Sequence, residues 1–176
     1  SRAKGNIYDF VESYKENCEK TAGKGLMCMF SGNHDVDRLA RHLHGDELKV
    51  AFAFILSMPG APFIYYGDEI GMRYVEGLKS VEGGYNRTGS RSPMQWDDST
   101  NAGFSSAPAS DLYIAMDPDK DRPTAKKEMA APDSLYHEVK KLIRIRQSHK
   151  ALQSRGKITF VYAEKNAYPL AYIREA

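Results

Sequence analysis

Residues 26–35 have the sequence LMCMFSGNHD, in which five apolar residues lead directly into a polar cluster. The apolar part, residues 26–30, has no polar alternation, which is typical of a strand buried on both faces in a parallel sheet. Asn33, His34 and Asp35 follow that strand at once. Since ligands bind at the carboxyl ends of such strands, these residues are candidate binding groups, the alternative being a loop that caps the next helix.

A second stretch of the same kind, GAPFIYYGDEIG, occupies residues 60–71. Residues 62–66 predict another buried strand, which is followed by Asp68 and Glu69. These two carboxylates invite interpretation as an acid and base pair. Because adjacent residues on an extended segment point to opposite faces, they are not expected to flank one scissile bond. We therefore expect a mainly structural role for this pair at the strand end.

Helical periodicity surrounds the two strands. An apolar stripe at 3.6-residue spacing predicts an amphipathic helix over residues 6–20, capped by Asn6. Residues 46–58 predict a second, nearly apolar helix, which ends before a Pro-Gly pair. The order helix, strand, helix, strand is that of β/α units, whose functional edge is the carboxyl end of the sheet.

The remainder of the chain divides into three parts. Residues 72–132 hold most of the Gly, Pro, Asn and Asp clusters and no convincing periodicity, which predicts a long structured excursion. An apolar stripe over residues 134–149 predicts another amphipathic helix. Residues 158–161 and 170–173 predict the two strands of an antiparallel hairpin.

The excursion contains the sequence RSPMQWD at residues 91–97. Arg91 offers a rigid fork of donors, Gln95 offers both a donor and an acceptor, and Trp96 offers a flat apolar face. This mixture suits a polyhydroxylated ligand. A self-packed loop with a buried Trp remains the alternative.

Composition excludes several classes of protein. The 176 residues are 41% hydrophobic and 27% charged with a net charge of +2, which is ordinary for a globular chain and favours no nucleic-acid partner. The longest apolar run, residues 50–58, is far shorter than the roughly 20 residues of a membrane span. Cys18 and Cys28 are too few for a disulfide scaffold or a zinc site.

Other motifs carry weaker signals. His42, His44 and Asp46 could bind a metal by composition, but ordinary surface residues are the preferred interpretation. The basic helix over residues 140–150 could contact phosphate, yet its pattern is also that of a helix covering a sheet. No phosphate-binding glycine loop and no Gly-x-Ser-x-Gly motif occurs. We expect no metal and no cofactor.

Taken together, residues 30–35 and 60–71 resemble the seventh and eighth strands of the α-amylase superfamily, glycoside hydrolase family 13. Residues 91–104 are similar to a loop of its α-glucosidase, oligo-1,6-glucosidase and trehalose synthase branch. The resemblance implies an α/β fold, the C-terminal portion of a TIM (β/α)8 barrel with its last two βα units. It implies a partial barrel over residues 1–150 and the first strands of an all-β C-terminal domain over residues 151–176.

The resemblance also implies roles for individual residues. In a retaining glycosidase, Asp35 matches the carboxylate that holds sugar hydroxyls as the ring flattens toward an oxocarbenium-like transition state. His34 and Asn33 match substrate-binding positions beside it, Arg38 lies where the branch often has an arginine near the leaving group, and Arg91 is a further substrate-binding candidate. The family carries its nucleophile Asp and its acid/base Glu on the fourth and fifth strands, N-terminal to any motif here. We therefore expect a fragment of an active enzyme, with no glycosidase activity in the isolated chain.

The expected substrate is an α-glucan or malto-oligosaccharide, with no nucleic-acid or membrane partner. Exposed edges of the two barrel strands predict a homo-oligomer or strand exchange between copies. Three alternatives stay open: a trehalose synthase-type isomerase, a non-catalytic carbohydrate-binding relative, and a phosphate or nucleic-acid binder that uses the basic helix.

Overall fold

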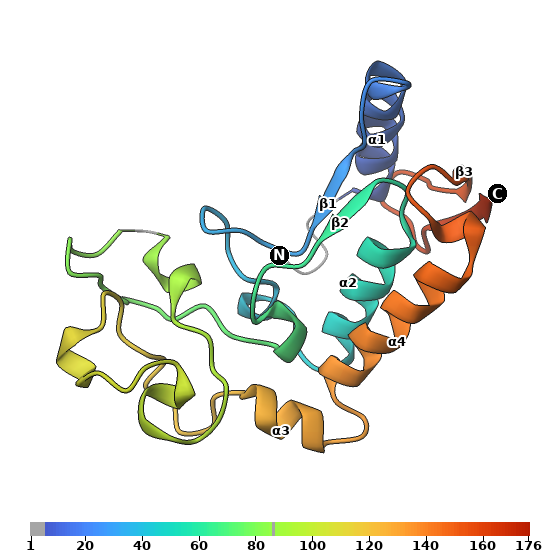
Figure 1. The fold of residues 1–176 in the computed structure, drawn as a ribbon. Helices are drawn as coiled ribbons and strands as arrows, with labels where there is room; N and C mark the ends of the chain where they lie inside the picture. Colours follow the sequence, from blue (N-terminus) through green and yellow to red (C-terminus); the bar gives the residue numbers. More distant parts are fainter. Residues whose placement is uncertain (1–5, 86) are drawn as a thin grey trace. The chain divides into compact units, whose positions relative to one another are not determined.

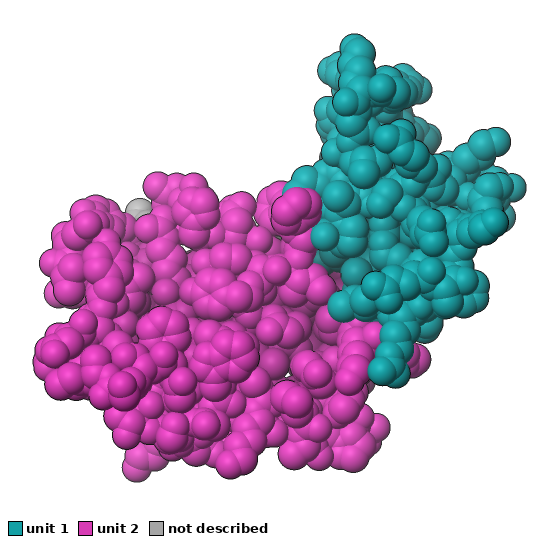
Figure 2. All heavy atoms as spheres, viewed as in Figure 1, with its two compact units in different colours: residues 1–29, 54–62, 142–176 teal, residues 30–53, 63–141 magenta. Residues whose placement is uncertain are grey.

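The computed structural model describes residues 6–85 and 87–176. They form two compact units, one of residues 6–29, 54–62 and 142–176 and the other of residues 30–53, 63–85 and 87–141 (Figure 2). The helices and strands follow in chain order as α1 Ile7–Thr21, β1 Cys28–Phe30, α2 Asp46–Ser57, β2 Ala61–Phe63, α3 Ala125–Ala130, α4 Leu135–Ser148, β3 Lys157–Tyr162 and β4 Ala171–Glu175 (Figure 1).

Strands β1 and β2 pair with each other in a two-stranded sheet. The amide of Ala61 donates to the carbonyl of Met27 at 2.8 Å, and the amide of Ser31 donates to the carbonyl of Phe63 at 2.9 Å. Both partners advance in the same direction, so the strands are parallel and α2 is their crossover. The predicted order of helix, strand, helix and strand is confirmed, although both strands are shorter than the sequence predicted.

The prediction that these strands are buried on both faces is wrong for this structure. Phe30 is 47% exposed, Phe63 is 59% exposed and Leu26, just before β1, is 45% exposed. The physical reason is that β1 and β2 form a sheet of only two short strands within the described residues, which is too narrow for both of its faces to be covered. Each strand therefore keeps one open edge, and the prediction of a homo-oligomer through such edges stays a prediction.

Helix α1 begins where the sequence predicted. The side chain of Asn6 accepts a hydrogen bond from the amide of Tyr8 at 3.1 Å and caps the helix. The buried Tyr14 of α1 packs edge-on against Phe160 of β3, with ring centroids 6.0 Å apart. Phe160 meets Tyr172 of β4 in the same way, so an aromatic cluster fills the first unit.

A buried arginine also stabilises the first unit. Arg146 of α4 donates to the carbonyls of Leu56, Met58 and Gly60 at 2.7–2.8 Å. These carbonyls lie at and just after the end of α2, where backbone acceptors lack helical partners. The guanidinium therefore satisfies the end of that helix in the interior of the unit.

The predicted hairpin is confirmed. β3 and β4 are antiparallel, with Ile158 opposite Arg174 and Phe160 opposite Tyr172. The predicted domain boundary near residue 150 stays a prediction. Across residues 6–85 and 87–176, none of the helices is both long enough and apolar enough to cross a membrane.

The second unit has its core between α2, the turn after β2 and α4. Phe52 and Met72 are fully buried, and Gly71 lies within contact distance of Leu48 and Leu135. The described part of the excursion over residues 72–132 contains short 3-10 helices and α3, and the sequence pattern did not predict α3. Thr124 begins α3 by accepting a hydrogen bond from the amide of Lys127.

Candidate functional site

The loop of residues 31–38 leaves β1 and is fastened at both ends to Asp68. Arg38 Nη1 donates to Asp68 Oδ1 at 2.8 Å, and the hydroxyl of Ser31 donates to Asp68 Oδ2 at 2.7 Å. The amide of Tyr65 donates to the same hydroxyl at 2.9 Å. The side chains of Arg38 and Asp68 are 0% and 1% exposed, so one buried carboxylate closes the loop.

Arg38 is enclosed by aromatic rings as well. Its guanidinium carbon lies 4.8 Å from the ring centroids of both Tyr65 and Tyr66, and Nη1 also donates to the carbonyl of Tyr66 at 2.7 Å. The geometry makes Arg38 part of the support beneath the loop. The guanidinium faces the interior in this structure. Its predicted contact with a substrate stays a prediction.

Close packing at Gly32 completes this support. A Cβ placed on Gly32 would lie 2.9 Å from Asp68 Oδ2, too close for an ordinary contact. Burial raises the pKa of Asp68, while the hydrogen bond from Ser31 and the guanidinium of Arg38 oppose that shift. The structural role predicted for Asp68 agrees with these contacts.

On the outer side of the loop, Asp35 presents an exposed carboxylate. Its Oδ1 lies 3.1 Å from Arg91 Nη2 and 3.0 Å from Arg87 Nη1, and its Oδ2 lies 3.5 Å from His34 Nε2. Arg91 Nε also donates to the carbonyl of His34 at 2.8 Å. The side chain of Asp35 is 45% exposed, so a ligand can reach it.

The structure therefore brings four of the five predicted site residues together. Asn33 Oδ1 accepts a hydrogen bond from the amide of Asp35 at 2.7 Å and shapes the turn that presents the carboxylate. His34 and Arg91 lie beside that carboxylate, whereas Arg38 lies on the buried side of the loop. Sequence reasoning missed Arg87, because a cation in an aperiodic excursion carries no pattern that assigns it a partner.

An open pocket of about 470 Å³ lies beside this cluster and shares Arg91 with it. Trp96, at its wall, is 52% exposed, so the alternative of a buried Trp is wrong. We call this cavity the aromatic pocket. It is lined by Tyr66, Glu69, Arg91, Pro93, Met94, Trp96, Phe104, Leu112, Tyr113 and Ile114.

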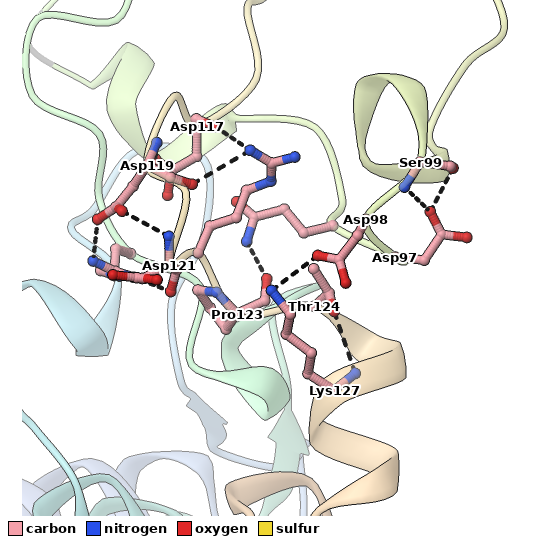
Figure 3. A network of polar contacts seen from close by, with 12 residues as sticks. Asp97, Asp98, Ser99, Asp117, Asp119, Asp121, Pro123, Thr124 and Lys127 are labelled. Carbon is pink, nitrogen blue, oxygen red and sulfur yellow. Dashed lines mark hydrogen bonds and ion pairs between the residues drawn. The ribbon is translucent and has the colours of Figure 1, made fainter.

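Polar contacts hold the loop of residues 96–103 in place, and Figure 3 shows those made by Asp97 and Asp98. Asp97 Oδ1 accepts from the amide of Ser99 at 2.8 Å and from its hydroxyl at 2.5 Å. Asp98 forms an ion pair with Lys127 of α3 at 2.9 Å. The amide of Trp96 donates to the carbonyl of Ala102 at 2.8 Å. These contacts stabilise the loop that carries the exposed indole of Trp96.

Glu69 is the carboxyl group of the aromatic pocket. Its Oε2 is buried and has no hydrogen-bond partner in the described part of the chain. Burial raises the pKa of Glu69 above its usual value, because apolar surroundings disfavour the charged form. The two adjacent carboxyl groups have different surroundings, as expected for neighbouring residues that point to opposite faces: Asp68 contacts Arg38 and Ser31, whereas Glu69 lines the aromatic pocket.

The predicted absence of a metal site stays a prediction, and the candidate ligands named by the sequence do not converge in the structure. His42 Nε2 lies 3.2 Å from Asp37 Oδ2, and Asp46 forms an ion pair with Lys49 at 3.0 Å. Within the described ranges, no three or more His, Cys, Asp or Glu side chains are grouped to hold a metal ion. The arrangement suits instead a ligand with hydroxyl groups and an apolar face.

Comparisons with known proteins point the same way. The family model described as "Alpha amylase, catalytic domain" matches residues 2–155. The chain is 31% identical over 178 residues to an oligo-1,6-glucosidase of Parageobacillus thermoglucosidasius, covering 82% of the chain and 31% of that protein. It is 30% identical over 178 residues to the human amino acid transporter heavy chain SLC3A1, covering 97% of the chain and 24% of that protein.

The fold has counterparts among solved structures. A crystal structure of the trehalulose synthase MutB in complex with Tris superposes with a TM-score of 0.79 at 24% identity, covering 98% of the chain and 36% of that protein. The fold is thus related to that α/β barrel enzyme. The chain spans about a third of the length of these relatives or less.

Proposed function

The chain belongs to the alpha-amylase catalytic-domain family of glycoside hydrolases, and from this premise we propose that it forms part of a retaining glycosidase acting on α-glucosidic bonds of starch-like oligosaccharides. The observation that carries the proposal is the exposed carboxylate of Asp35 at the end of β1, with His34 and Arg91 beside it. Sugar hydroxyls are donors and acceptors that such a group can hold in a fixed orientation.

In this proposal Asp35 binds hydroxyls of the sugar whose glycosidic bond breaks. An ionised carboxylate strengthens these hydrogen bonds as positive charge develops on the ring, so it favours the transition state over the bound substrate. His34 would donate to the same sugar. Arg91 and Arg87 hold Asp35 Oδ1, which leaves Oδ2 as the atom more open to a hydroxyl.

The proposal assigns the nucleophile Asp and the acid/base Glu to parts of the enzyme outside these 176 residues. The short span of the chain relative to its relatives supports this assignment, as does the interpretation of the chain as the last two βα units of the barrel. The isolated chain is then expected to release no glucose from maltose or isomaltose.

The test uses the full-length protein that contains this chain, with maltose and isomaltose as substrates. Asp35→Asn keeps the size of the side chain but removes its charge, and kcat/KM should fall by about 10²–10³-fold. The matched control is Asp46→Asn on the exposed start of α2, which should leave kcat/KM unchanged. Full activity of the Asp35→Asn enzyme would overturn the proposal.

A second candidate function is supported by one comparison. The human transporter heavy chain matches 97% of the chain at 30% identity, so a non-catalytic member of the family also fits these residues. In that case the full-length protein would show no hydrolysis, whether or not Asp35 is replaced. Product analysis separates a third outcome, since an isomerase of the kind related to trehalose synthase releases a rearranged disaccharide rather than glucose.

A further inference from the structure

Arg41 joins two segments of the second unit that are far apart in the chain. Its Nη1 lies 2.7 Å from Asp37 Oδ1, and its Nη2 lies 2.7 Å from Glu76 Oε1. Its guanidinium carbon also lies 3.9 Å from the ring centroid of Tyr74, which is a stacking distance for an arginine on an aromatic ring. A single ion pair at the surface adds little rigidity, but a guanidinium held by two carboxylates and a ring has few other positions.

Asp37 belongs to the same loop as Asp35, two residues further along. Both of its carboxylate oxygens have a partner, since Oδ1 pairs with Arg41 and Oδ2 lies 3.2 Å from His42 Nε2. Burial acts to raise the pKa of Asp37, but the hydrogen bonds with Arg41 and His42 outweigh it and lower the pKa below its ordinary value. Asp37 is therefore ionised at neutral pH and fastens the end of this loop to Arg41.

Tyr74 extends the contact to the 3-10 turn of residues 88–91. Gly89 in this turn packs directly against Tyr74, because a Cβ on Gly89 would lie 2.6 Å from Tyr74 Cε1 and would collide with the carbonyl of Val75. The amide of Val75 donates to the carbonyl of Gly89 at 3.1 Å. Tyr74 therefore contacts both Arg41 and the turn, and only glycine leaves room for this packing.

The turn in its own right reaches the loop that carries Asp35. The hydroxyl of Ser90, a fully buried residue, donates to the carbonyl of Val36 at 2.7 Å. Arg87 precedes the turn and Arg91 ends it, and they lie 3.0 Å and 3.1 Å from Asp35 Oδ1. The contacts that begin at Arg41 therefore end on the carboxylate that is proposed to bind sugar.

From these contacts we propose that Arg41 is a positioning residue for Asp35. It acts by two routes, since Asp37 fixes the loop and Tyr74 supports the turn whose arginines hold the carboxylate. Neither route needs contact between Arg41 and a substrate. The effect on hydrolysis rests on the proposed function, whereas the support of the turn by Arg41 does not.

Amide hydrogen exchange of the 176-residue chain tests the support of the turn without any substrate. Arg41→Met removes both ion pairs and the stacking but keeps a long side chain. We expect the amides of Val75 and Ser90, which both make backbone hydrogen bonds at the turn, to exchange about tenfold faster. The amide of Ala61 in β2 should stay within about twofold of the parent value. Unchanged exchange at Val75 and Ser90 would overturn the proposal.

The matched control is Lys49→Met. Lys49 forms an ion pair with Asp46 at 3.0 Å, and its side chain is 34% exposed, close to the 30% of Arg41. This substitution should leave exchange at both amides of the turn within about twofold. The same acceleration in the control would indicate a general loss of stability and would count against the proposal. If Arg41→Met does not fold by circular dichroism, Tyr74→Leu replaces it, because loss of the ring breaks the same contact.

Kinetics of the full-length protein test the effect on Asp35. With maltose as substrate, Arg41→Met should lower kcat about tenfold while KM changes less than about threefold, because a small displacement of Asp35 weakens the transition state more than the bound substrate. In the Asp35→Asn background the same substitution should lower kcat less than about twofold, since the group that Arg41 positions is already lost. Equal losses in both backgrounds would show that Arg41 acts elsewhere and would refute the proposal.

The two measurements separate this proposal from the proposed function. A full-length parent protein that hydrolyses neither maltose nor isomaltose would overturn the proposed function, and hydrogen exchange would still decide whether Arg41 holds the turn. Hydrolysis by the parent protein with an unchanged kcat in Arg41→Met would overturn this proposal and leave the proposed function standing.

Discussion

Two arginine–carboxylate pairs lie on opposite sides of the loop of residues 31–38. They consist of the same chemical groups but differ in their exposure to solvent. Arg38 and Asp68 are 2.8 Å apart, and their side chains are 0% and 1% exposed. Arg91 and Asp35 are 3.1 Å apart, and their side chains are 36% and 45% exposed. The first pair is shielded from solvent, whereas the second pair remains partly exposed to solvent.

The difference shows that burial, not pairing, decides what such a carboxylate does. Both carboxylate oxygens of Asp68 accept hydrogen bonds, one from Arg38 and one from Ser31, so neither is free to bind a ligand. Asp35 stays open to solvent, and its exposed arginines can rearrange as a ligand arrives. The buried pair supports the loop, and the exposed pair is available for binding.

The largest effect should come from breaking the buried pair. Arg38→Met keeps much of the side-chain volume but leaves Asp68 buried without its guanidinium, which should lower the free energy of unfolding by about 3–5 kcal/mol. Urea unfolding followed by circular dichroism measures the change. The matched control is Arg91→Met, which should cost at most about 1 kcal/mol. Equal losses in the two variants would remove the distinction.

A smaller loss is expected from filling the space beside the buried carboxylate. In Gly32→Ala the new Cβ would lie 2.9 Å from Asp68 Oδ2, so either the loop or the carboxylate must shift. Such overpacking should cost about 1–3 kcal/mol in thermal or urea unfolding. Gly25→Ala is the control, since nothing lies within 4 Å of a Cβ there. A neutral Gly32→Ala substitution would show that the support around Asp68 is loose.

The same contrast explains how much the sequence could predict. Periodicity predicted α1 from its cap at Asn6, and it predicted the helix and strand order through β2 and the hairpin of β3 and β4. It missed α3, because six residues are too few for a helical stripe to repeat. Local pattern is therefore sufficient where an element is long or has a clear cap.

Burial of single polar residues was beyond local pattern. Arg38 and Arg91 are both arginines near a carboxylate in the sequence, and nothing in either stretch tells which one will be enclosed by Tyr65 and Tyr66. The pairing of Asp68 with Arg38 joins residues 30 positions apart, and that of Arg91 with Asp35 joins residues 56 apart. Contacts of this range depend on the folded arrangement. The motif of residues 31–38 therefore includes Arg38, whereas the structure places Arg91 beside the carboxylate of Asp35.

The exposed pair should be weak and sensitive to salt. A double-mutant cycle with Asp35→Asn and Arg91→Met should give a coupling free energy of about 0.2–1 kcal/mol at low salt, which falls further as the salt concentration rises. The same cycle with Asp68→Asn and Arg38→Met should give a larger coupling that salt barely changes, because water and ions do not reach that pair. A salt-independent coupling at Asp35 would contradict its assignment as the solvated pair.

The smallest effect concerns Glu69, whose carboxyl group forms no ion pair with an arginine in the described part of the chain. Its pKa is raised by burial, while hydrogen bonds with the backbone of Glu69 and Gly67 oppose that shift. The folded state therefore favours protonated Glu69. This contribution to stability is fully present below the ordinary glutamate pKa of about 4.3 and is lost as the pH rises through the higher folded value.

Glu69→Gln removes this contribution, so the melting temperature of the parent chain minus that of the variant should fall as the pH rises across this window. Asp68 titrates in both proteins, so its contribution largely cancels in the difference between the two melting temperatures. A difference that stays flat or grows with pH would mean that the carboxyl of Glu69 is solvated like that of Asp35 rather than enclosed by the pocket.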